Sequence, residues 1–146
     1  MRIAVLNGPN LNLLGTREPA LYGTTTLAEI EARLRAVGAE LGVDVFCAQH
    51  NGEGELITEI QGLRGHAQGA LINAGAYSHT SLALRDAFAA AEVPFVEVHL
   101  TNIYAREPER RHSMLAPGAC AVICGFGAEG YEWGLRGLVA LLKGRE

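Results

Sequence analysis

Residues 3–23 read IAVLNGPNLNLLGTREPALYG. The first four residues are a short apolar run that predicts a buried strand. The next seventeen, residues 7–23, contain two prolines, three glycines and three asparagines, a composition incompatible with a helix. We therefore expect a long loop at the carboxyl end of a strand, where open α/β sheets place their ligands. A loop of this length in a small domain is usually a functional lid, and a surface loop without function is the alternative.

Arg17 and Tyr22 both lie in this loop. A tyrosine hydroxyl, with a pKa of about 10, is a poor base at neutral pH. A guanidinium held close to it favours the phenolate. The pair could therefore remove a proton from a bound ligand, which favours the lid over the inert loop.

Length and charge bound the class of protein. The chain of 146 residues suits one domain, residues 1–146, which buries roughly two-thirds of the surface of its unfolded form. Its formal net charge is -4 and its basic residues are scattered, so we expect no nucleic-acid partner. The apolar run at the amino terminus is too short for a signal peptide, and none is long enough to span a membrane. These features predict a cytoplasmic protein with no membrane partner.

The cysteines and lysines exclude two chemistries. Cys47, Cys120 and Cys124 sit in apolar runs and are predicted to be small core residues, not a disulfide or a metal site. The single lysine, Lys143, lies three places from the carboxyl terminus, which argues against a buried Schiff-base lysine.

Strands and helices alternate along the whole chain. The pattern predicts strands over residues 3–6, 43–48, 69–73, 95–98 and 119–124, and helices over 27–41, 53–64, 82–92 and 129–143. Thr26 is the expected cap of the first helix, and Ser78, Thr80 or Ser81 that of the third. The alternation predicts an α/β fold, a doubly wound parallel sheet of five strands in the flavodoxin-like order 2-1-3-4-5.

In that order the first, third and fourth strands are neighbours, so their carboxyl ends share one crevice. Each strand changes there from apolar to polar residues, which suits a small polar ligand. The polar residues at these ends are Asn7, Asn10, Asn73, His99, Thr101 and Asn102.

His99 could be a general acid or base, or a histidine that only caps the loop. Glu97 lies two residues earlier on an extended chain and therefore faces the same side as His99. Its carboxylate could hold the imidazole in one tautomer and raise its basicity, which favours a role as acid.

Two further charged features stay open. Arg106, Arg110 and Arg111 could form a solvated, salt-bridged loop, or one of them could grip a ligand carboxylate over the crevice. Asp86 follows Arg85 directly, and neighbours in sequence do not face each other on a helix. Asp86 therefore points to solvent, across an interface or into a crevice.

The glycines of residues 125–130 have the spacing of the dinucleotide-binding fingerprint, but no strand with an acidic residue follows them. The sequence also lacks a phosphate loop, a nucleophile elbow and a paired-histidine zinc motif. We therefore expect chemistry without a metal or a redox cofactor. A flavodoxin-like module that binds a flavin or a phosphate without catalysis is the alternative function.

Over almost its whole length, the sequence resembles the type II 3-dehydroquinate dehydratases. The matching stretches are residues 7–15, 17–19, 22–23, 53–57, 73–77, 79–81, 84–87, 97–100, 102, 105–107, 110, 112–113, 125–127 and 130–131. Two stretches depart from the family pattern, Pro108-Glu109 and His50-Asn51-Gly52, and neither contains a catalytic position.

The resemblance implies a hydro-lyase that converts 3-dehydroquinate to 3-dehydroshikimate by anti elimination through an enolate, in aromatic amino-acid biosynthesis (the shikimate pathway) or in quinate breakdown. It places the base on Tyr22, the arginine that activates this base on Arg17, and the acid on His99. Asn10 would hold a water or the enolate oxygen, and Glu97 would orient His99. The implied substrate contacts are Asn73, His79, Asp86, Leu100, Thr101 and Arg110. The family is typically a dodecamer, a tetramer of trimers, in which the equivalent of Asp86 reaches a neighbour's active site.

Overall fold

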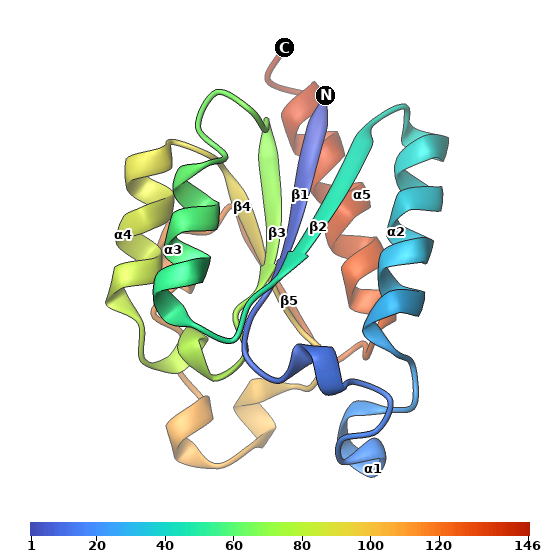
Figure 1. Cartoon of the computed structure of the whole chain (residues 1–146), viewed down its shortest axis with the longest axis vertical. Helices are drawn as coiled ribbons and strands as arrows, with labels where there is room; N and C mark the ends of the chain where they lie inside the picture. The colour runs from blue at the N-terminus through green and yellow to red at the C-terminus, as the bar shows by residue number, and fades with distance from the viewer.

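The computed structural model describes all 146 residues and contains one parallel sheet in the order β2-β1-β3-β4-β5. Its strands are β1 (Arg2–Asn7), β2 (Asp44–Gln49), β3 (Gly69–Asn73), β4 (Phe95–His99) and β5 (Ala121–Cys124). Helices α2 (Leu27–Leu41) and α5 (Glu129–Lys143) cover one face, and α3 (Glu53–Gln61) and α4 (Leu82–Ala91) cover the other (Figure 1). The predicted doubly wound α/β fold and its strand order are confirmed.

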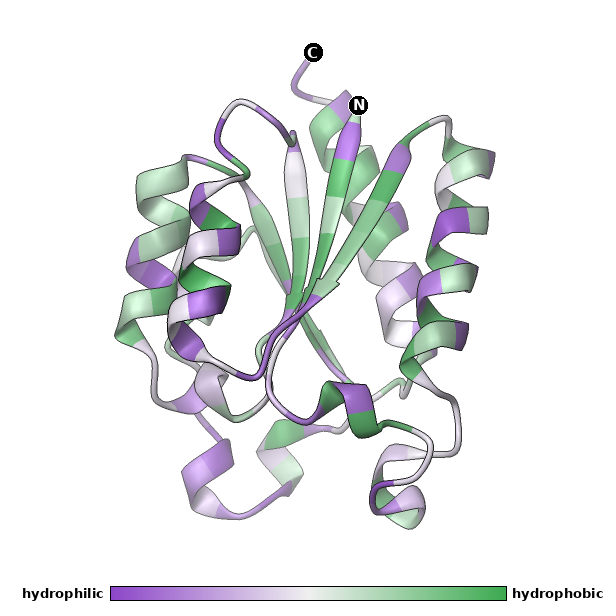
Figure 2. Ribbon diagram, viewed as in Figure 1, coloured by the Kyte–Doolittle hydropathy of each residue, from purple (hydrophilic) through white to green (hydrophobic).

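Each strand divides its side chains between two hydrophobic clusters. Ile3 and Val5 of β1 pack with α2 and α5, whereas Ala4 and Leu6 pack with α3 and α4, because successive side chains of a strand point to opposite faces. Figure 2 shows the result as strands that are hydrophobic over most of their length between helices that carry polar residues on their outer sides. Both faces of the sheet are thus covered, as parallel sheets require.

The predicted caps hold two of the helices. Thr26 accepts a hydrogen bond of 3.2 Å from the backbone amide of Glu29 at the start of α2. Of the three candidates for α4, Ser81 is the cap, and it accepts from the amide of Leu84 at 3.0 Å. No helix has the length and apolar character needed to cross a bilayer.

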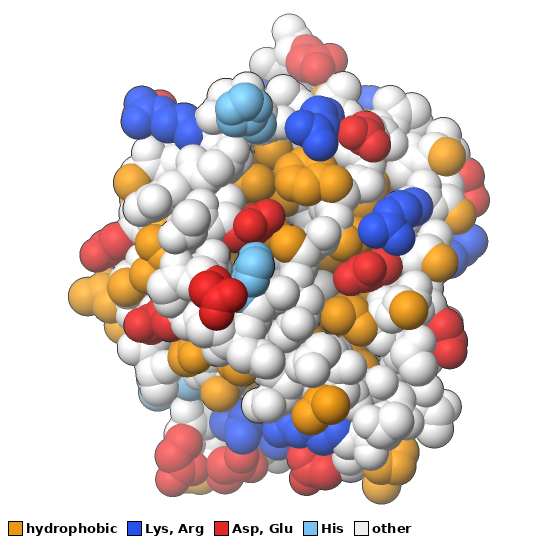
Figure 3. All heavy atoms as spheres, in the orientation of Figure 1, with side chains coloured by type: hydrophobic (Ala, Val, Ile, Leu, Met, Phe, Trp, Pro, Cys, Tyr) orange, Lys and Arg blue, Asp and Glu red, His pale blue; other side chains and the backbone are white.

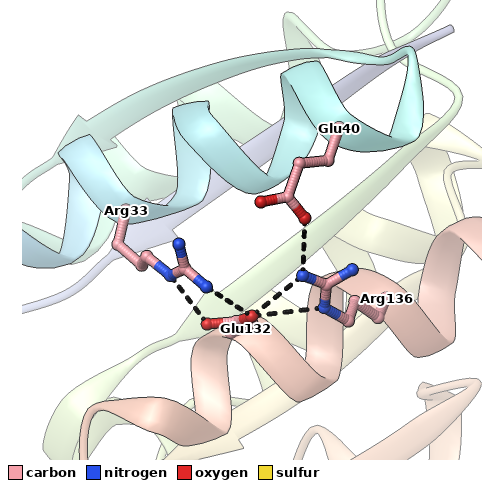
Figure 4. A network of polar contacts seen from close by, with 4 residues as sticks. All are labelled: Arg33, Glu40, Glu132 and Arg136. Atoms are coloured by element: carbon pink, nitrogen blue, oxygen red, sulfur yellow. Dashed lines mark hydrogen bonds and ion pairs between the residues drawn. The ribbon is translucent and has the colours of Figure 1, made fainter.

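An ion-pair network joins α2 to α5 on the outer surface (Figure 4). Glu132 accepts two hydrogen bonds from Arg33, at 2.9 and 3.0 Å, and Arg136 bridges Glu132 to Glu40. The hydrogen bond from Arg33 is the main reason that the pKa of Glu132 lies below its usual value. The network links the outer sides of two helices whose packing rests on the hydrophobic cluster beneath them.

The connections at the carboxyl edge of the sheet are short helical turns. They are η1 (Leu11–Leu13), α1 (Pro19–Tyr22), η2 (Gly75–His79), η3 (Ile103–Ala105) and η4 (Pro108–Arg110). A further turn, η5 (Ala116–Gly118), lies at the opposite edge, next to the start of β4. Figure 1 places α1 below the strand ends, and Figure 3 shows Lys and Arg side chains gathered at the same end of the molecule.

Loop 7–23 is therefore more regular than predicted. The expectation of no helix in it is wrong, because Pro19 begins the one-turn helix α1 and Gly23, at φ 82, ends it. Proline fits the first position of a helix, where its missing N–H needs no partner. A helix of one turn is too short to be predicted from the composition of a loop of seventeen residues.

The prediction that all three cysteines belong to the core is also wrong. Cys120 is exposed, and Cys47 and Cys124 are half-buried. Cys120 precedes β5, an edge strand that pairs only with β4 and leaves Ala121 and Val122 exposed. Burial raises the pKa of Cys47 to about 11, which keeps this thiol protonated at neutral pH.

Candidate active site

A crevice of about 130 Å³ opens at the carboxyl ends of β1, β3 and β4. Its lining comes from loop 7–23, from the segment after β3 and from the segment after β4. The lining residues are Pro9, Asn10, Leu11, Leu14, Arg17, Tyr22, Asn73, Gly75, Ala76, His79, His99, Leu100, Thr101, Ile103, Arg106 and Arg110.

Of the residues expected in the crevice from the sequence, all line it except Glu97, Asp86, Asn7 and Asn102. Glu97 is fully buried and lies behind His99. Asp86 is exposed on the outer side of α4, because that helix packs on the sheet through Leu84 and Phe88. Within one chain, the structure therefore does not bring Asp86 to the other site residues.

Tyr22 sits between two guanidinium groups. Arg106 donates a hydrogen bond of 3.1 Å from Nη1 to the Tyr22 hydroxyl. The Arg17 guanidinium carbon lies 4.9 Å from the centre of the Tyr22 ring, against its face. Positive charge next to a phenol stabilises the phenolate, so this tyrosine is suited to accept a proton. The contact with the hydroxyl itself comes from Arg106 and not from the predicted Arg17.

His99, the last residue of β4, is buried to 5% exposure and lines the crevice. Its Nε2 lies 3.5 Å from Glu97 Oε1, an ion-pair distance, and makes no hydrogen bond. The two side chains face the same side of the strand, as their spacing predicted. A carboxylate next to an imidazole stabilises the protonated ring. A histidine must be protonated to act as a general acid.

His79 and His112 form a reciprocal pair. His79 Nδ1 lies 2.7 Å from the carbonyl oxygen of His112, and His112 Nε2 lies 2.8 Å from the carbonyl oxygen of His79. A carbonyl only accepts, so Nδ1 of His79 carries a proton, and Nε2 is the free nitrogen of the neutral ring. Burial lowers the pKa of His79, which keeps the ring neutral at neutral pH. His79 therefore offers an acceptor to a ligand hydroxyl.

Asn73, at the end of β3, is held from two sides. Its Nδ2 donates to the Tyr131 hydroxyl at 3.0 Å, and its Oδ1 accepts from the amide of Gly75 at 3.2 Å. Tyr131 in turn donates to Asn7 Oδ1 at 2.5 Å. Asn7 is completely buried and holds Tyr131, whereas Asn73 lines the crevice.

Asn10 adopts a left-handed backbone conformation, with φ at 69°. Its amide donates to Asn51 Oδ1 at 3.1 Å, and Gln49 Nε2 donates to the same oxygen at 3.0 Å. The Tyr77 hydroxyl donates to the Asn51 carbonyl at 2.8 Å. Asn51 thus ties the start of loop 7–23 to the segments that follow β2 and β3, although it lies in a stretch that departs from the family pattern.

Three arginines line the crevice, and they also pair with Glu18 and Glu107, which lie outside the lining. They are Arg17, Arg106 and Arg110, and the lining includes no Asp or Glu. A planar guanidinium binds a carboxylate through two parallel hydrogen bonds. The charge and the polar strand ends together suit a small anionic ligand that carries hydroxyl groups.

Two other hollows lie near this crevice. One of about 330 Å³ between α2 and α5 is lined by Glu29, Arg33 and Glu132 among others, and one of about 460 Å³ shares Tyr22, Leu100, Thr101 and Arg106 with the crevice. No group of three or more His, Cys, Asp or Glu side chains is arranged to hold a metal ion.

Two contacts in the site were not predicted from the sequence. Arg106 was one of three loop arginines, any of which could be solvated or bind a ligand carboxylate, and Ser113, which donates a hydrogen bond to Glu97 Oε1, lay only within a matching stretch. Both residues lie in the irregular segment after β4, where no periodicity indicates which side chains turn inward.

Comparisons with known proteins agree with the geometry. The family described as Dehydroquinase class II matches residues 1–139. The chain is 64% identical over 143 residues to a 3-dehydroquinate dehydratase of Gemmatimonas aurantiaca, which covers 98% of this chain and 94% of that protein. It is 57% identical over 144 residues to the protein of that name from a Nostoc species, covering 99% and 98%. A crystal structure of type II dehydroquinase from Propionibacterium acnes superposes with a TM-score of 0.91 at 42% identity, covering 95% and 96%.

Proposed function

The chain belongs to the class II dehydroquinase family and is a hydro-lyase that dehydrates 3-dehydroquinate, and we propose that it does so by anti elimination through an enolate. In this reaction a base removes a proton from the carbon next to the ketone, and the electron pair moves onto the ketone oxygen. The enolate then expels the hydroxyl group, which takes a proton and leaves as water. The site must therefore supply a base, an acid and a stabilised oxyanion.

Tyr22 is the proposed base, and its contact with Arg106 is the observation that carries the proposal. The hydrogen bond of 3.1 Å from Arg106 and the Arg17 guanidinium on the ring face both stabilise the phenolate. Tyr22 belongs to α1 in loop 7–23, so the ordering of this loop over the crevice brings the base to the substrate. Asn10, in the same loop, would hold the enolate oxygen or a water next to it.

His99 is the proposed acid that protonates the leaving hydroxyl. Glu97 lies behind it and stabilises the imidazolium that delivers the proton. After the elimination, Tyr22 holds a proton and His99 lacks one. Return of the proton from Tyr22 to His99, directly or through solvent, restores both groups for the next turnover.

The remaining lining residues would bind the substrate. Asn73 and His79 offer an amide and a neutral imidazole to its hydroxyl groups. Arg110, with the backbone of Leu100 and the hydroxyl of Thr101, would hold its carboxylate and ring. A bound anion also balances the positive charge of the arginines.

Mixing the protein with 3-dehydroquinate tests the reaction, because the product is a conjugated enone whose ultraviolet absorbance the substrate lacks. Tyr22→Phe should lower kcat by roughly 10²- to 10⁴-fold, because it removes the general base, while calorimetry should show largely unchanged substrate binding. Tyr104→Phe is the matched control, since Tyr104 is 58% exposed and lies outside the crevice. Near-normal turnover by the Tyr22→Phe protein would contradict the assignment.

We further propose a homo-dodecamer, a tetramer of trimers, in which Asp86 of one subunit contacts the substrate of another. The exposure of Asp86 on α4, away from the crevice of its own chain, supports this assembly. We also propose that residues 1–146 form one catalytic domain, since both hydrophobic clusters pack on the same sheet. The proposed setting is the cytoplasm, in aromatic amino-acid biosynthesis or quinate breakdown.

A further inference from the structure

Glu97 carries a buried carboxyl group with a single hydrogen-bond donor. The residue is completely buried, and Oε1 accepts a hydrogen bond from the Ser113 hydroxyl. Oε2 has no partner. Because a buried carboxylate is costly unless it is hydrogen-bonded, the contact with Ser113 is the one hydrogen bond that offsets the burial of Glu97.

The direction of the Ser113 hydrogen bond follows from its other partners. Ser113 Oγ accepts from the amide of Leu115 at 3.1 Å and from the amide of Ala116 at 3.0 Å. A hydroxyl has two lone pairs and one proton, so both lone pairs are in use and the proton has Glu97 Oε1 as its acceptor. Leu115 is completely buried, which anchors this turn to the core.

Glu97 Oε1 also faces His99. The distance from Oε1 to His99 Nε2 is 3.5 Å, and Nε2 has no other partner. Glu97 Oε1 is the only acceptor near Nε2, although the two atoms do not form a hydrogen bond at this distance, and this places Nε2 as the nitrogen that would carry a proton towards the carboxylate. The other ring nitrogen, Nδ1, is then the one available to the crevice that His99 lines.

We propose that Ser113 is a positioning residue for the acid step, which keeps Glu97 as a proton acceptor and thereby commits His99 to act on the leaving hydroxyl through Nδ1. This inference rests on the proposed function, because it assumes that His99 is the acid. Ser113 itself does not line the crevice.

The charges around His99 explain why this contact matters. His79 stacks on His99 with ring centres 6.0 Å apart, and the side chains of Arg17, Arg106 and Arg110 line the same crevice, as does Tyr22. The arginines disfavour a positive charge on His99. Glu97 is the carboxylate nearest to His99, with Oε1 3.5 Å from Nε2, so a weaker Glu97 carboxylate leaves the imidazolium less stable.

Kinetics of Ser113→Ala, in parallel with the wild type, test the proposal. We expect kcat to fall roughly 10- to 100-fold with KM changed by less than about threefold, as for the loss of a residue that orients a catalytic histidine. The limb of the kcat profile that falls as pH rises should move to lower pH by about one unit, the size expected for a lost hydrogen bond to a charged group. Ser113→Thr retains the hydroxyl and should restore both values.

Ile60→Val is the control for stability alone. Ile60 is completely buried on α3 and lies outside the crevice, so its loss of one methyl group should lower the melting temperature without moving the pH profile. If Ser113→Ala lowers kcat only as its melting temperature falls, and its pH limb coincides with that of the wild type, Ser113 is structural and the proposal is wrong.

A second measurement does not depend on turnover. Diethyl pyrocarbonate reacts with neutral imidazole, so its rate of modification of His99, mapped by mass spectrometry, rises with pH in the unliganded protein. The midpoint of this rise should lie about one pH unit lower in Ser113→Ala than in the wild type and Ser113→Thr proteins. If the midpoint shifts in Ser113→Ala but the wild-type protein does not dehydrate 3-dehydroquinate, the proposed function is wrong and the effect of Ser113 on His99 stands. An unchanged midpoint in an active enzyme would refute only the role of Ser113.

Discussion

Two tyrosines near the crevice have opposite environments. Tyr131 is buried, and burial raises its pKa, so it stays protonated, donating to Asn7 and accepting from Asn73. Tyr22 is half-buried, and its hydroxyl accepts from Arg106. Burial without a charge holds a phenol neutral, whereas a neighbouring cation favours its ionised form. The same side chain is therefore a structural donor at one position and suits a base at the other.

We expect Arg106→Ala to lower kcat by roughly 10- to 100-fold, because a hydrogen bond to a charged group contributes about 1.5–3 kcal/mol. Steady-state kinetics with 3-dehydroquinate measure this loss. Arg17→Ala should also be impaired, since its guanidinium lies on the ring of Tyr22. Arg64→Ala is the control, because Arg64 is exposed after α3 and pairs only with Glu92. Equal kcat for Arg106→Ala and the control would show that the contact with Tyr22 does not support catalysis.

His79 should make the protein less stable in acid. Burial lowers the folded-state pKa of His79, so at acid pH the unfolded chain binds a proton that the folded chain does not. The free energy of unfolding should be constant with respect to this group above the unfolded pKa of about 6.5 and should fall as the pH drops below it. Urea unfolding at several pH values measures the slope. His79→Gln should show a shallower fall, and identical slopes in both proteins would contradict the prediction.

For single residues, contacts within a regular strand could be predicted from the sequence, whereas contacts made by irregular segments could not. The proximity of Glu97 and His99 followed from their separation by two residues on a strand. Arg106 and Ser113 come from the segment between β4 and β5, where neither spacing nor composition distinguishes an inward side chain from a solvated one. Arg106 could be named only as one of three arginines.

Among the secondary-structure elements, β1 and β3 meet most closely just past their ends. The Gly8 amide donates to the Asn73 carbonyl at 2.8 Å, and a Cβ at Gly8 would lie 2.4 Å from the carbonyl oxygen of Ala74. This contact positions both the start of loop 7–23 and Asn73 in the crevice. Only glycine allows the two backbones to approach in this way.

Gly8→Ala should therefore destabilise the fold by about 1–3 kcal/mol, because a backbone oxygen cannot move aside without separating the strands. Chemical denaturation measures the stability, and turnover should fall as well because loop 7–23 and Asn73 both shift. Gly54→Ala on α3 is the matched control, since no atom lies within 4 Å of its added Cβ. Equal stability of the two variants would mean that the close approach is not needed.

Helices and central strands were predictable because their apolar residues repeat with a clear period. The predicted strand at 69–73 coincides with β3, and the predicted helix at 27–41 coincides with α2. The fifth strand begins at Ala121 and not at residue 119, because Pro117 and Gly118 belong to η5. The predicted strand order already placed the fifth strand at an edge, but the apolar run 119–124 was interpreted as core, so Cys120 was wrongly assigned. An apolar run does not show which of its residues an edge strand leaves exposed.

For the whole molecule, the surface of α4 bears on the proposed assembly. Leu82 and Asp86 are four residues apart and therefore share one side of the helix. Leu82 is 45% exposed and Asp86 is exposed beside it, so an apolar and an acidic side chain face outward together. A contact with another subunit would bury the leucine and would bring the carboxylate towards a crevice rich in arginine. One chain alone supplies no acidic residue to that crevice.

Subunit mixing distinguishes a shared site from a self-contained one. Asp86→Ala and Tyr22→Phe should each be poorly active alone, because one lacks the carboxylate that a neighbour needs and the other lacks its own base. If Asp86 acts in a neighbouring crevice, random reassembly of equal amounts should restore about a quarter of the sites, those that pair an intact Tyr22 with a neighbour's intact Asp86. The measurement is turnover after mild dissociation and reassembly, with each variant treated alone as the control and the mass followed by sedimentation. Activity that never exceeds the average of the two separate variants would show that Asp86 does not serve a neighbouring crevice.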